Sequence, residues 1–224
     1  MTFSVIAKCP DSGEFGVAAA TAEPAVGKLL THARAGAGAV ATQAKLNPYL
    51  GIDGVRMLRA GLSADDVVET LRKQDLRAES RQFAAIDADG NTAAWTGSEC
   101  LPWAGSIDGD GYSTQGNRLV GPPVLEAVAA VMERTRGQSL PDRLLAALEA
   151  GVAAGGDREG EVSATIYIVA TEDYPLWDIR VDHCDDPIAE LKRLHAVFRE
   201  ELLPEIRKMP TRANPAGAPS EHTA

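Results

Sequence analysis

Two stretches near the start of the chain decide the expected fold: TFSVIAK over residues 2–8 and FGVAAAT over residues 15–21. Each is a short run of mostly apolar residues, as expected for a strand of a packed sheet. The sequence PDSG between them, over residues 10–13, combines residues that favour a tight turn. The chain therefore predicts a β-hairpin that begins at its second residue.

Beyond this hairpin, strands and helices are expected in blocks. In chain order we expect two short strands around a glycine bend within residues 29–43, helices at 52–59 and after Ser63, strands at 83–86, 92–96 and 112–115, helices after Pro122 and Ser139, strands at 162–170 and 176–181, and a final helix after Asp186. Such blocks predict antiparallel sheets packed together with helices outside, not a parallel βαβ sheet. The small residues of the early strands predict that another part of the chain packs close to them.

The composition is that of a folded globular protein. The chain has 224 residues, with 45% hydrophobic and 24% charged, a normal balance for one domain. We expect a single domain over residues 1–209. Residues 210–224 are rich in Pro, Ala and Thr, and we expect them to be disordered, because few apolar side chains offset the entropy of ordering.

The charge pattern bears on partners and location. A formal net charge of −10 works against nucleic-acid binding, which needs a concentrated basic surface. The start of the chain has neither a basic region nor an apolar run long enough for a signal peptide or a membrane span. We therefore expect a cytoplasmic protein with no nucleic-acid or membrane partner.

No motif indicates a metal or a cofactor. Cys9, Cys100 and Cys184 share no metal-ligand spacing. The stretch DADGN over residues 87–91 imitates the start of a calcium loop, but the sixth position lacks the required glycine, so we predict a hairpin turn. The acidic residues around His183 are adjacent in sequence and cannot all face one ion.

Several short words of the sequence carry a family resemblance. They are TFSVIA (2–7), AVG (25–27), GAVATQ (38–43), WAG (103–105), QGN (115–117), AGGDR (154–158) and DPIAEL (186–191). Together, from Thr2 to about Phe198, they resemble a bacterial and archaeal domain-of-unknown-function family of proteins similar to N-terminal-nucleophile (Ntn) hydrolases. The resemblance implies a proteasome β-subunit-like fold, an α+β four-layer αββα sandwich of two antiparallel sheets.

The resemblance also implies a nucleophile. An Ntn hydrolase uses the side chain of its first residue as nucleophile and the α-amine of that residue as base. Thr2 fills this role once methionine aminopeptidase removes Met1, which a small residue at position 2 permits. With a pKa of about 7.7–8.0, an α-amine is partly neutral near pH 7. The alternative is a threonine that merely begins a strand.

Amide side chains near strand ends are the next candidates. Gln43 and Asn47 follow the glycine bend of residues 36–38 and are predicted to present donors to an oxyanion, Gln43 as a catalytic residue and Asn47 at the substrate. Asn117 and Gln115 form another polar word, which we assign to catalysis and substrate binding respectively. The alternatives are close sheet packing for the glycines and turn bonding for Asn47.

A third set surrounds a glycine pair at the end of a predicted helix. Asp157 is predicted to orient the amine of Thr2, and Arg158 to bind a substrate carboxylate. The alternative is a helix cap with a surface ion pair. Trp103 and Cys100 are expected to line the pocket, although an aromatic residue is more often part of a core.

The chain departs from proteasome-type sites, which carry an acid at the end of the second strand and a lysine after it. Here residues 21–24 read TAEP, and the lysines nearby are Lys28 and Lys45. A proteasome-like amine relay, and peptidase activity with it, is therefore without support. His32 and His195, like His222, lie apart from any serine or cysteine constellation, so no Ser-His-Asp triad is indicated either.

Three hypotheses remain open. The first is a metal-independent amidohydrolase that acts on a small C–N amide substrate through Thr2, without a cofactor. The others are a non-catalytic assembly-forming protein and a small-molecule-binding module. In each case we expect a homo-oligomer, because the last helix carries extra apolar residues at Leu202, Leu203 and Ile206.

Overall fold

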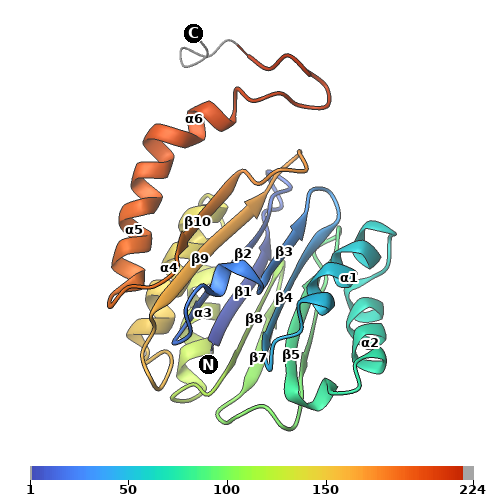
Figure 1. Cartoon of the computed structure of the whole chain (residues 1–224), viewed down its shortest axis with the longest axis vertical. Coiled ribbons are helices and arrows are strands. Elements are labelled where there is room, and N and C mark those ends of the chain that lie inside the picture. Colours follow the sequence, from blue (N-terminus) through green and yellow to red (C-terminus); the bar gives the residue numbers. More distant parts are fainter. Residues whose placement is uncertain (1, 219–224) are drawn as a thin grey trace.

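The computed structural model describes residues 2–218, whose strands form two antiparallel sheets (Figure 1). The larger sheet has the order β10-β9-β2-β1-β8-β7 and the smaller one β3-β4-β5-β6. The strands are β1 (Thr2–Lys8), β2 (Phe15–Thr21), β3 (Thr31–Arg34), β4 (Gly38–Ala44), β5 (Arg81–Ile86), β6 (Thr92–Thr96), β7 (Gly105–Gly109), β8 (Tyr112–Asn117), β9 (Ser163–Val169) and β10 (Trp177–Val181).

Helices cover both outer faces of the sheet pair. They are α1 (Pro48–Arg59), α2 (Ala64–Gln74), α3 (Pro123–Arg134), α4 (Leu140–Ala153), α5 (Pro187–Val197) and α6 (Leu203–Ile206). The larger sheet is covered by α3, α4 and α5, and the smaller one by α1 and α2, on the opposite side of the molecule in Figure 1. Strands β1 and β8 pack on β4 and β5 of the facing sheet. The chain is thus an α+β, four-layer αββα sandwich, as the sequence predicts.

Alternation along β1 decides which layer each of its side chains meets. Phe3 is fully buried in the apolar core beneath the helices, whereas Ile6 belongs to the core between the sheets. Successive side chains of a strand point to opposite faces, so Thr2 and Ser4 share the inter-sheet face of Ile6. The register of β1 therefore turns the candidate nucleophile toward the second sheet.

Small side chains fill much of the space between the sheets. Ala19 of β2, Ala39 and Ala41 of β4 and Ala84 of β5 are all fully buried in this layer. Because an alanine side chain is a single methyl group, the two backbones approach closely enough for longer polar side chains to reach the opposite sheet. This explains the small-residue strands seen in the sequence.

Capping residues set several helix boundaries. Ser63 Oγ accepts a hydrogen bond from Asp66 N at 3.2 Å, and Asp186 Oδ1 accepts one from Ala189 N at 3.0 Å, which confirms both predicted helix starts. Helix α1 begins at Pro48, earlier than the predicted residue 52. The reason is Asn47, whose side chain accepts a hydrogen bond from Tyr49 N at 3.2 Å and caps the helix.

One strand was missing from the sequence prediction. Strand β7 has the sequence GSIDG, with two of its five residues exposed, and lies at the edge of the larger sheet beside β8. Glycine and aspartate have low strand propensity, so pairing with β8, and not local preference, makes this segment a strand. The DADGN stretch, in contrast, forms the predicted turn, in which Asp87 Oδ1 accepts hydrogen bonds from Asp89 N and Asn91 N, both at 3.0 Å.

The last helix is bent and partly buried. A π-helical turn over Phe198–Leu202 separates α5 from α6. Leu203 is only 6% exposed and Ile206 packs against the same core, whereas Leu202 is 45% exposed. Of the apolar residues proposed for an interface between copies, two are therefore used inside the chain itself.

The predicted tail lies partly outside the described residues. Residues 210–218 are mostly exposed and make local hydrogen bonds, such as Ala218 N to Lys208 O at 2.8 Å, and Arg212 forms an ion pair with Asp173. Residues 219–224 lie outside the described part. None of the helices in residues 2–218 combines the length and the apolar character that a membrane-spanning helix needs.

Two adjacent leucines test how the last helix docks. We expect Leu203→Ala to lower the free energy of unfolding by about 2–5 kcal/mol, because it opens a cavity in the core. The same change at the exposed Leu202 should alter it by less than about 0.5 kcal/mol. Urea denaturation followed by tryptophan fluorescence measures both, since Trp177 stacks on Phe198 at 4.7 Å between ring centroids. Equal effects of the two variants would contradict the observed docking.

Candidate active site

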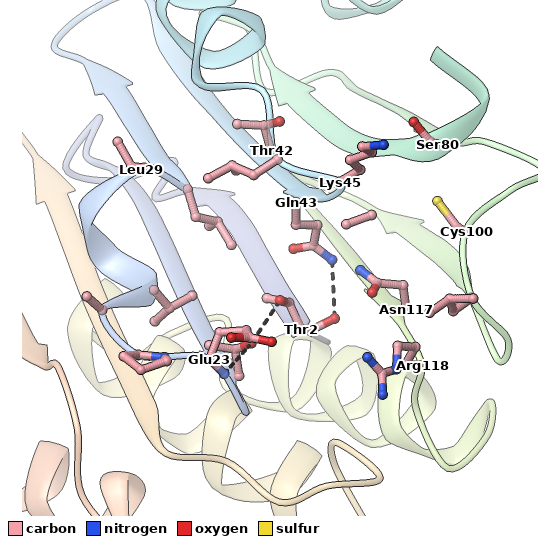
Figure 2. Close-up of a pocket in the computed structure, with 18 of the residues that line it drawn as sticks. Thr2, Glu23, Leu29, Thr42, Gln43, Lys45, Ser80, Cys100, Asn117 and Arg118 are labelled. Carbon is pink, nitrogen blue, oxygen red and sulfur yellow. Dashed lines mark hydrogen bonds between the residues drawn. The ribbon is translucent and has the colours of Figure 1, made fainter. Parts of the chain in front are cut away.

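A cavity of about 510 Å³ opens where β1 begins and where β2, β4 and β8 end (Figure 2). Its wall includes residues from each of these strand ends, from the β2–β3 and β4–α1 connections and from the loop before β7. Thr2, Gln43 and Asn117, three of the four predicted catalytic residues, line it together with Cys100. Residues distant in sequence thus meet at one end of the sandwich.

Thr2 lies between two strands at the floor of this cavity. It pairs with Thr21 on β2 and with Asn117 on β8, and only 8% of its surface is exposed. The hydroxyl oxygens of Thr2 and Thr21 are 3.0 Å apart and share a hydrogen bond. The carbonyl oxygen of Thr2 accepts a hydrogen bond from Gln43 Nε2 at 3.3 Å. The hydroxyl of Thr2 is therefore held within its own sheet, and its backbone is held by the facing sheet.

A buried amide network stands behind Thr2. Gln43 Nε2 and Asn117 Nδ2 both donate to Gln82 Oε1, at 2.8 and 3.0 Å. Gln82 Nε2 in turn donates to Gly116 O at 2.8 Å, and Ser4 Oγ donates to Gln43 Oε1 at 2.7 Å. These bonds fix the orientation of each amide. Asn117 Nδ2 carries two N–H groups, of which Gln82 takes one, so the second is a candidate donor to a ligand in the cavity.

Gln82 escaped the sequence analysis, although it is central to this network. It is fully buried on β5, just before the apolar run that begins at Phe83. A lone amide next to a run of buried residues was the available signal, because a buried amide needs hydrogen-bond partners. The pattern gave no way to tell which residues those partners are.

Asp157 lies beside the cavity wall and not in it. Its two carboxylate oxygens accept hydrogen bonds from Ala22 N at 3.1 Å and from Glu159 N at 2.9 Å. Burial raises the pKa of this carboxyl above its ordinary value, although both hydrogen bonds act in the opposite direction. The contact places Asp157 against the segment that follows Thr21. Its predicted role toward the Thr2 amine stays a prediction.

The four predicted substrate-binding residues do not line the cavity. Asn47 caps α1 and donates to Asp75 Oδ2 at 2.9 Å, and Arg158 is exposed, with Nε donating to Leu119 O at 2.8 Å. Gln115 is buried between the sheets, where Nε2 donates to Ala41 O at 3.2 Å. Trp103 packs against the helix-covered core. Asn47 thus makes the turn bonding weighed as its alternative.

The glycine bend is likewise a packing feature. Gly38 has a φ of 143°, and a Cβ added there would lie 2.1 Å from Ile86 O. Gly36, with a φ of 68°, lies in the turn between β3 and β4. Neither residue lines the cavity, so both follow the close-packing alternative.

Charged residues of the cavity were only partly anticipated. Glu23 and Lys45, noted in the sequence as the nearest acid and one of the nearest lysines, both line it, and so does Arg118. Arg118 has a φ of 54° and forms an ion pair with Glu159. Arg118 lies just after β8 with a positive φ, and no sequence pattern predicts this backbone conformation.

Cys100 is poorly suited to act as a nucleophile. Burial raises the pKa of its thiol, and its Sγ donates to Arg81 O at 3.2 Å. A thiol with a raised pKa carries little of the reactive thiolate at neutral pH. Of Thr2 and Cys100, the hydroxyl of Thr2 is therefore the better nucleophile candidate.

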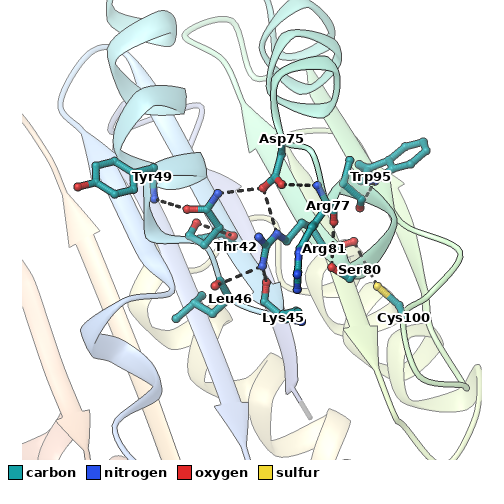
Figure 3. Close-up of polar contacts among 12 residues, drawn as sticks. Thr42, Lys45, Leu46, Tyr49, Asp75, Arg77, Ser80, Arg81, Trp95 and Cys100 are labelled. Carbon is teal, nitrogen blue, oxygen red and sulfur yellow. Dashed lines mark hydrogen bonds and ion pairs between the residues drawn. The ribbon is translucent and has the colours of Figure 1, made fainter.

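A buried ion pair supports the cavity wall from behind (Figure 3). Arg81 Nε lies 3.0 Å from Asp75 Oδ2, with side chains 12% and 6% exposed. Arg81 also donates to the carbonyl oxygens of Lys45 and Leu46. Burial alone would raise the pKa of Asp75, but the hydrogen bonds from Asn47, Arg77 N and Arg81 outweigh it and hold the pKa below its ordinary value. The pair fixes the β4–α1 connection.

Neither a metal-binding cluster nor a histidine in the cavity wall is present among the described residues. Within residues 2–218, no group of three or more His, Cys, Asp or Glu side chains is placed to hold a metal ion. His32 and His195 do not line the cavity, and His195 stacks on Trp177 at 4.9 Å between ring centroids. His222 lies outside the described residues.

Comparisons with known proteins give a family and a close structural relative. A family model described as "Family of unknown function (DUF1028)" matches residues 2–191. A crystal structure of a protein of the same family from Silicibacter pomeroyi is 30% identical, with a TM-score of 0.90 over 98% of this chain and 99% of that one. Anbu (ancestral β-subunit) from Yersinia bercovieri is 13% identical, with a TM-score of 0.41 over 93% of this chain and 98% of that one. No curated protein sequence matches the chain.

The buried ion pair should make stability depend on pH in a defined direction. Because the pKa of Asp75 is lowered in the folded state, its contribution is present above the unfolded pKa of about 4 and is lost as the pH falls through the folded pKa. We expect Asp75→Asn to lower the free energy of unfolding by about 1–3 kcal/mol at pH 7, and by less in acid.

Asp53→Asn is the matched control. Asp53 pairs with Arg56 on the surface, with side chains 42% and 73% exposed, so its loss should cost less than about 1 kcal/mol. Urea denaturation of the three proteins between pH 7 and pH 3 makes the comparison. A deficit of Asp75→Asn that stays constant over this range would show that the carboxylate charge is not what stabilises the connection.

Proposed function

The chain belongs to the DUF1028 family of unknown function, and we propose that it is a metal-independent Ntn amidohydrolase that cleaves a C–N amide bond of a small substrate. One observation carries the proposal: Thr2, a hydroxyl-bearing residue at the start of β1, lies at the floor of a 510 Å³ cavity between two sheets. Once Met1 is removed, its α-amine and its hydroxyl belong to the same residue and meet the same ligand.

The first half of the reaction forms an ester. The neutral α-amine of Thr2 takes the proton of Oγ1 while Oγ1 bonds to the carbonyl carbon of the substrate, and the carbonyl electron pair moves onto oxygen. When that oxyanion collapses, the C–N bond breaks, and the leaving nitrogen takes the proton from the ammonium of Thr2. The products of this half are a free amine and an acyl ester on Thr2.

The second half is hydrolysis of the ester. A water molecule loses a proton to the α-amine as its oxygen bonds to the acyl carbon. Collapse then breaks the bond to Oγ1, which recovers the proton. The products are a carboxylic acid and the free enzyme. Every proton in the two halves is therefore supplied and taken up by Thr2, the substrate or water.

Amide donors near Thr2 suit the charge that develops. N–H groups stabilise an oxyanion without transferring a proton, and they do so best when they are already oriented. Asn117 lines the cavity, and its amide is oriented by Gln82. We assign the oxyanion contact to Asn117, with Gln43 as a positioning residue that holds the backbone of Thr2.

A second candidate is a small-molecule-binding protein. The observation in its favour is that Thr2 Oγ1 already shares a hydrogen bond with Thr21 at 3.0 Å, as a structural threonine would. A cavity with an apolar wall would bind a ligand without any nucleophile. The two candidate functions differ in the role of the Thr2 hydroxyl: it is the nucleophile in the first, and in the second the side chain only fills space in the cavity wall.

The free-amine mechanism requires a processed N-terminus. We expect intact-protein mass spectrometry of the protein from its native host to show a mass that lacks Met1. Treatment with an amine-acetylating reagent should then modify Thr2 at its α-amine. If most molecules keep Met1, the amine of Thr2 lies in a peptide bond, and the proposed base does not exist.

Substitutions at Thr2 separate the hydroxyl from the shape. In a screen of N-acyl amides, Thr2→Ser should retain turnover, because it keeps a hydroxyl beside the amine. Thr2→Val, which has nearly the same shape, should lose roughly a thousandfold in kcat. Both should change the free energy of unfolding by about 1 kcal/mol or less. Turnover by Thr2→Val as fast as by the wild type would rule out the Thr2 hydroxyl as the nucleophile, whereas ligand binding with no turnover by the wild type would favour the binding candidate.

A further inference from the structure

The cavity has two unlike walls, with Thr2 between them. The β2–β3 connection supplies one wall, which is largely apolar and includes Val26, Leu29 and Leu30, with Glu23 as its one charged residue. The other wall carries Lys45 and Arg118, together with Ser80, Cys100 and Asn117. Figure 2 shows Leu29 on one side of Thr2 and Gln43, and Lys45, Ser80 and Arg118 on the other. A ligand that spans the floor therefore meets apolar atoms at one end and a cation at the other.

Lys45 is the cation that the fold leaves available. Among residues 2–218 no carboxylate forms an ion pair with it. Arg118, in contrast, is paired with Glu159. Glu99 also lines the polar wall, and both Glu99 and Lys45 are exposed. The charge of Lys45 can thus meet an anionic group of a ligand.

The backbone beneath Lys45 is held at both ends of the residue. Its N–H donates to Ser80 O at 3.1 Å, and its carbonyl oxygen accepts a hydrogen bond from Arg81. Arg81 is itself fixed by its buried ion pair with Asp75 (Figure 3). A fixed backbone removes the loop-ordering part of the entropy that is lost when Lys45 binds an anion. Lys45 is thus an exposed lysine on a fixed stretch of backbone, which suits a recognition residue better than a lysine on a loose loop.

We propose that the substrate is an amide with an apolar substituent on one side of the scissile bond and a carboxylate on the other, the carboxylate bound by Lys45. The inference rests on the proposed function for the statement that the ligand is an amide. A second hollow of about 460 Å³ shares Lys45, Ser80 and Glu99 with the cavity. Larger groups next to the carboxylate therefore have room beyond Lys45.

Binding to Thr2→Val tests the proposal without consuming the ligand. The probes are N-hexanoylglycine and N-hexylsuccinamate, which place the carboxylate on opposite sides of the amide, the neutral N-hexanoylglycinamide, and N-acetylglycine with its short chain. By isothermal titration calorimetry, we expect at least one of the two long carboxylates to bind. The neutral probe and the short-chain probe should bind to Thr2→Val at least about fivefold more weakly than that long carboxylate does.

Lysine variants identify the group that binds the carboxylate. In the Thr2→Val background, Lys45→Met keeps the aliphatic stem and removes the charge. This substitution should weaken binding of the carboxylate probe by about fivefold to tenfold and leave the affinity for the neutral probe unchanged. Lys28→Met is the matched control, because Lys28 is exposed and does not line the cavity, so it should change neither probe.

The outcomes separate this inference from the proposed function. If Lys45→Met weakens charged and neutral probes equally or not at all, or if neither long carboxylate binds, the inference is overturned. Wild-type hydrolysis of neutral amides with no effect of Lys45→Met would leave the hydrolase standing and overturn the carboxylate assignment. Lys45-dependent carboxylate binding without any hydrolysis by the wild type would support the site and count against the hydrolase.

Discussion

Hydrogen bonds between the two sheets are the interaction on which the rest of this structure depends. Gln43 of β4 reaches Thr2 O, Gln82 of β5 reaches Gly116 O, and Gln115 of β8 reaches back to Ala41 O. Each uses a backbone oxygen of the facing sheet. Bonds of this kind are possible only where backbones lie close together, and the alanines between the sheets allow that approach.

The same interaction explains why the cavity lies where it does. The cross-sheet amides end near the first residue of β1, and beyond them the β2–β3 and β4–α1 connections form the walls that carry Leu29 and Lys45. A buried amide that loses its partner costs about 1–3 kcal/mol, so the network resists movement of the floor. The hydroxyl of Thr2 is thus presented by a rigid layer, as preorganised catalysis and specific binding both require.

Much of the fold follows from the sequence, because local patterns decide it. The block order of strands and helices gave the layered architecture, and Ser63 and Asp186 marked helix starts by the capping chemistry of their own side chains. The edge strand β7 could not be predicted, since GSIDG becomes a strand only by pairing with β8. Helix α1 was predicted too short, because the amide of Asn47 serves as its cap.

The candidate site was less predictable, for a physical reason. Strand ends indicated Thr2, Gln43 and Asn117, which do meet at the cavity, but Gln115 lies deeper on the same inter-sheet face and Trp103 packs against the helix-covered core. One step along a strand reverses the face of a side chain, so a polar word such as QGN places Gln115 and Asn117 on one face without saying which of them reaches the cavity. Lys45 and Gln82 depend on contacts between strands distant in sequence, which no local pattern contains.

The central claim is that the Thr2 hydroxyl is the reactive group of this cavity, and a threonine-directed β-lactone tests it most directly. The protein from its native host would be treated with the reagent, digested with trypsin and mapped by tandem mass spectrometry. The account predicts one adduct, as an ester on Thr2 in the peptide TFSVIAK of residues 2–8, with no Met1 before it. An adduct on Cys100 or another residue, with Thr2 unmodified, would contradict it.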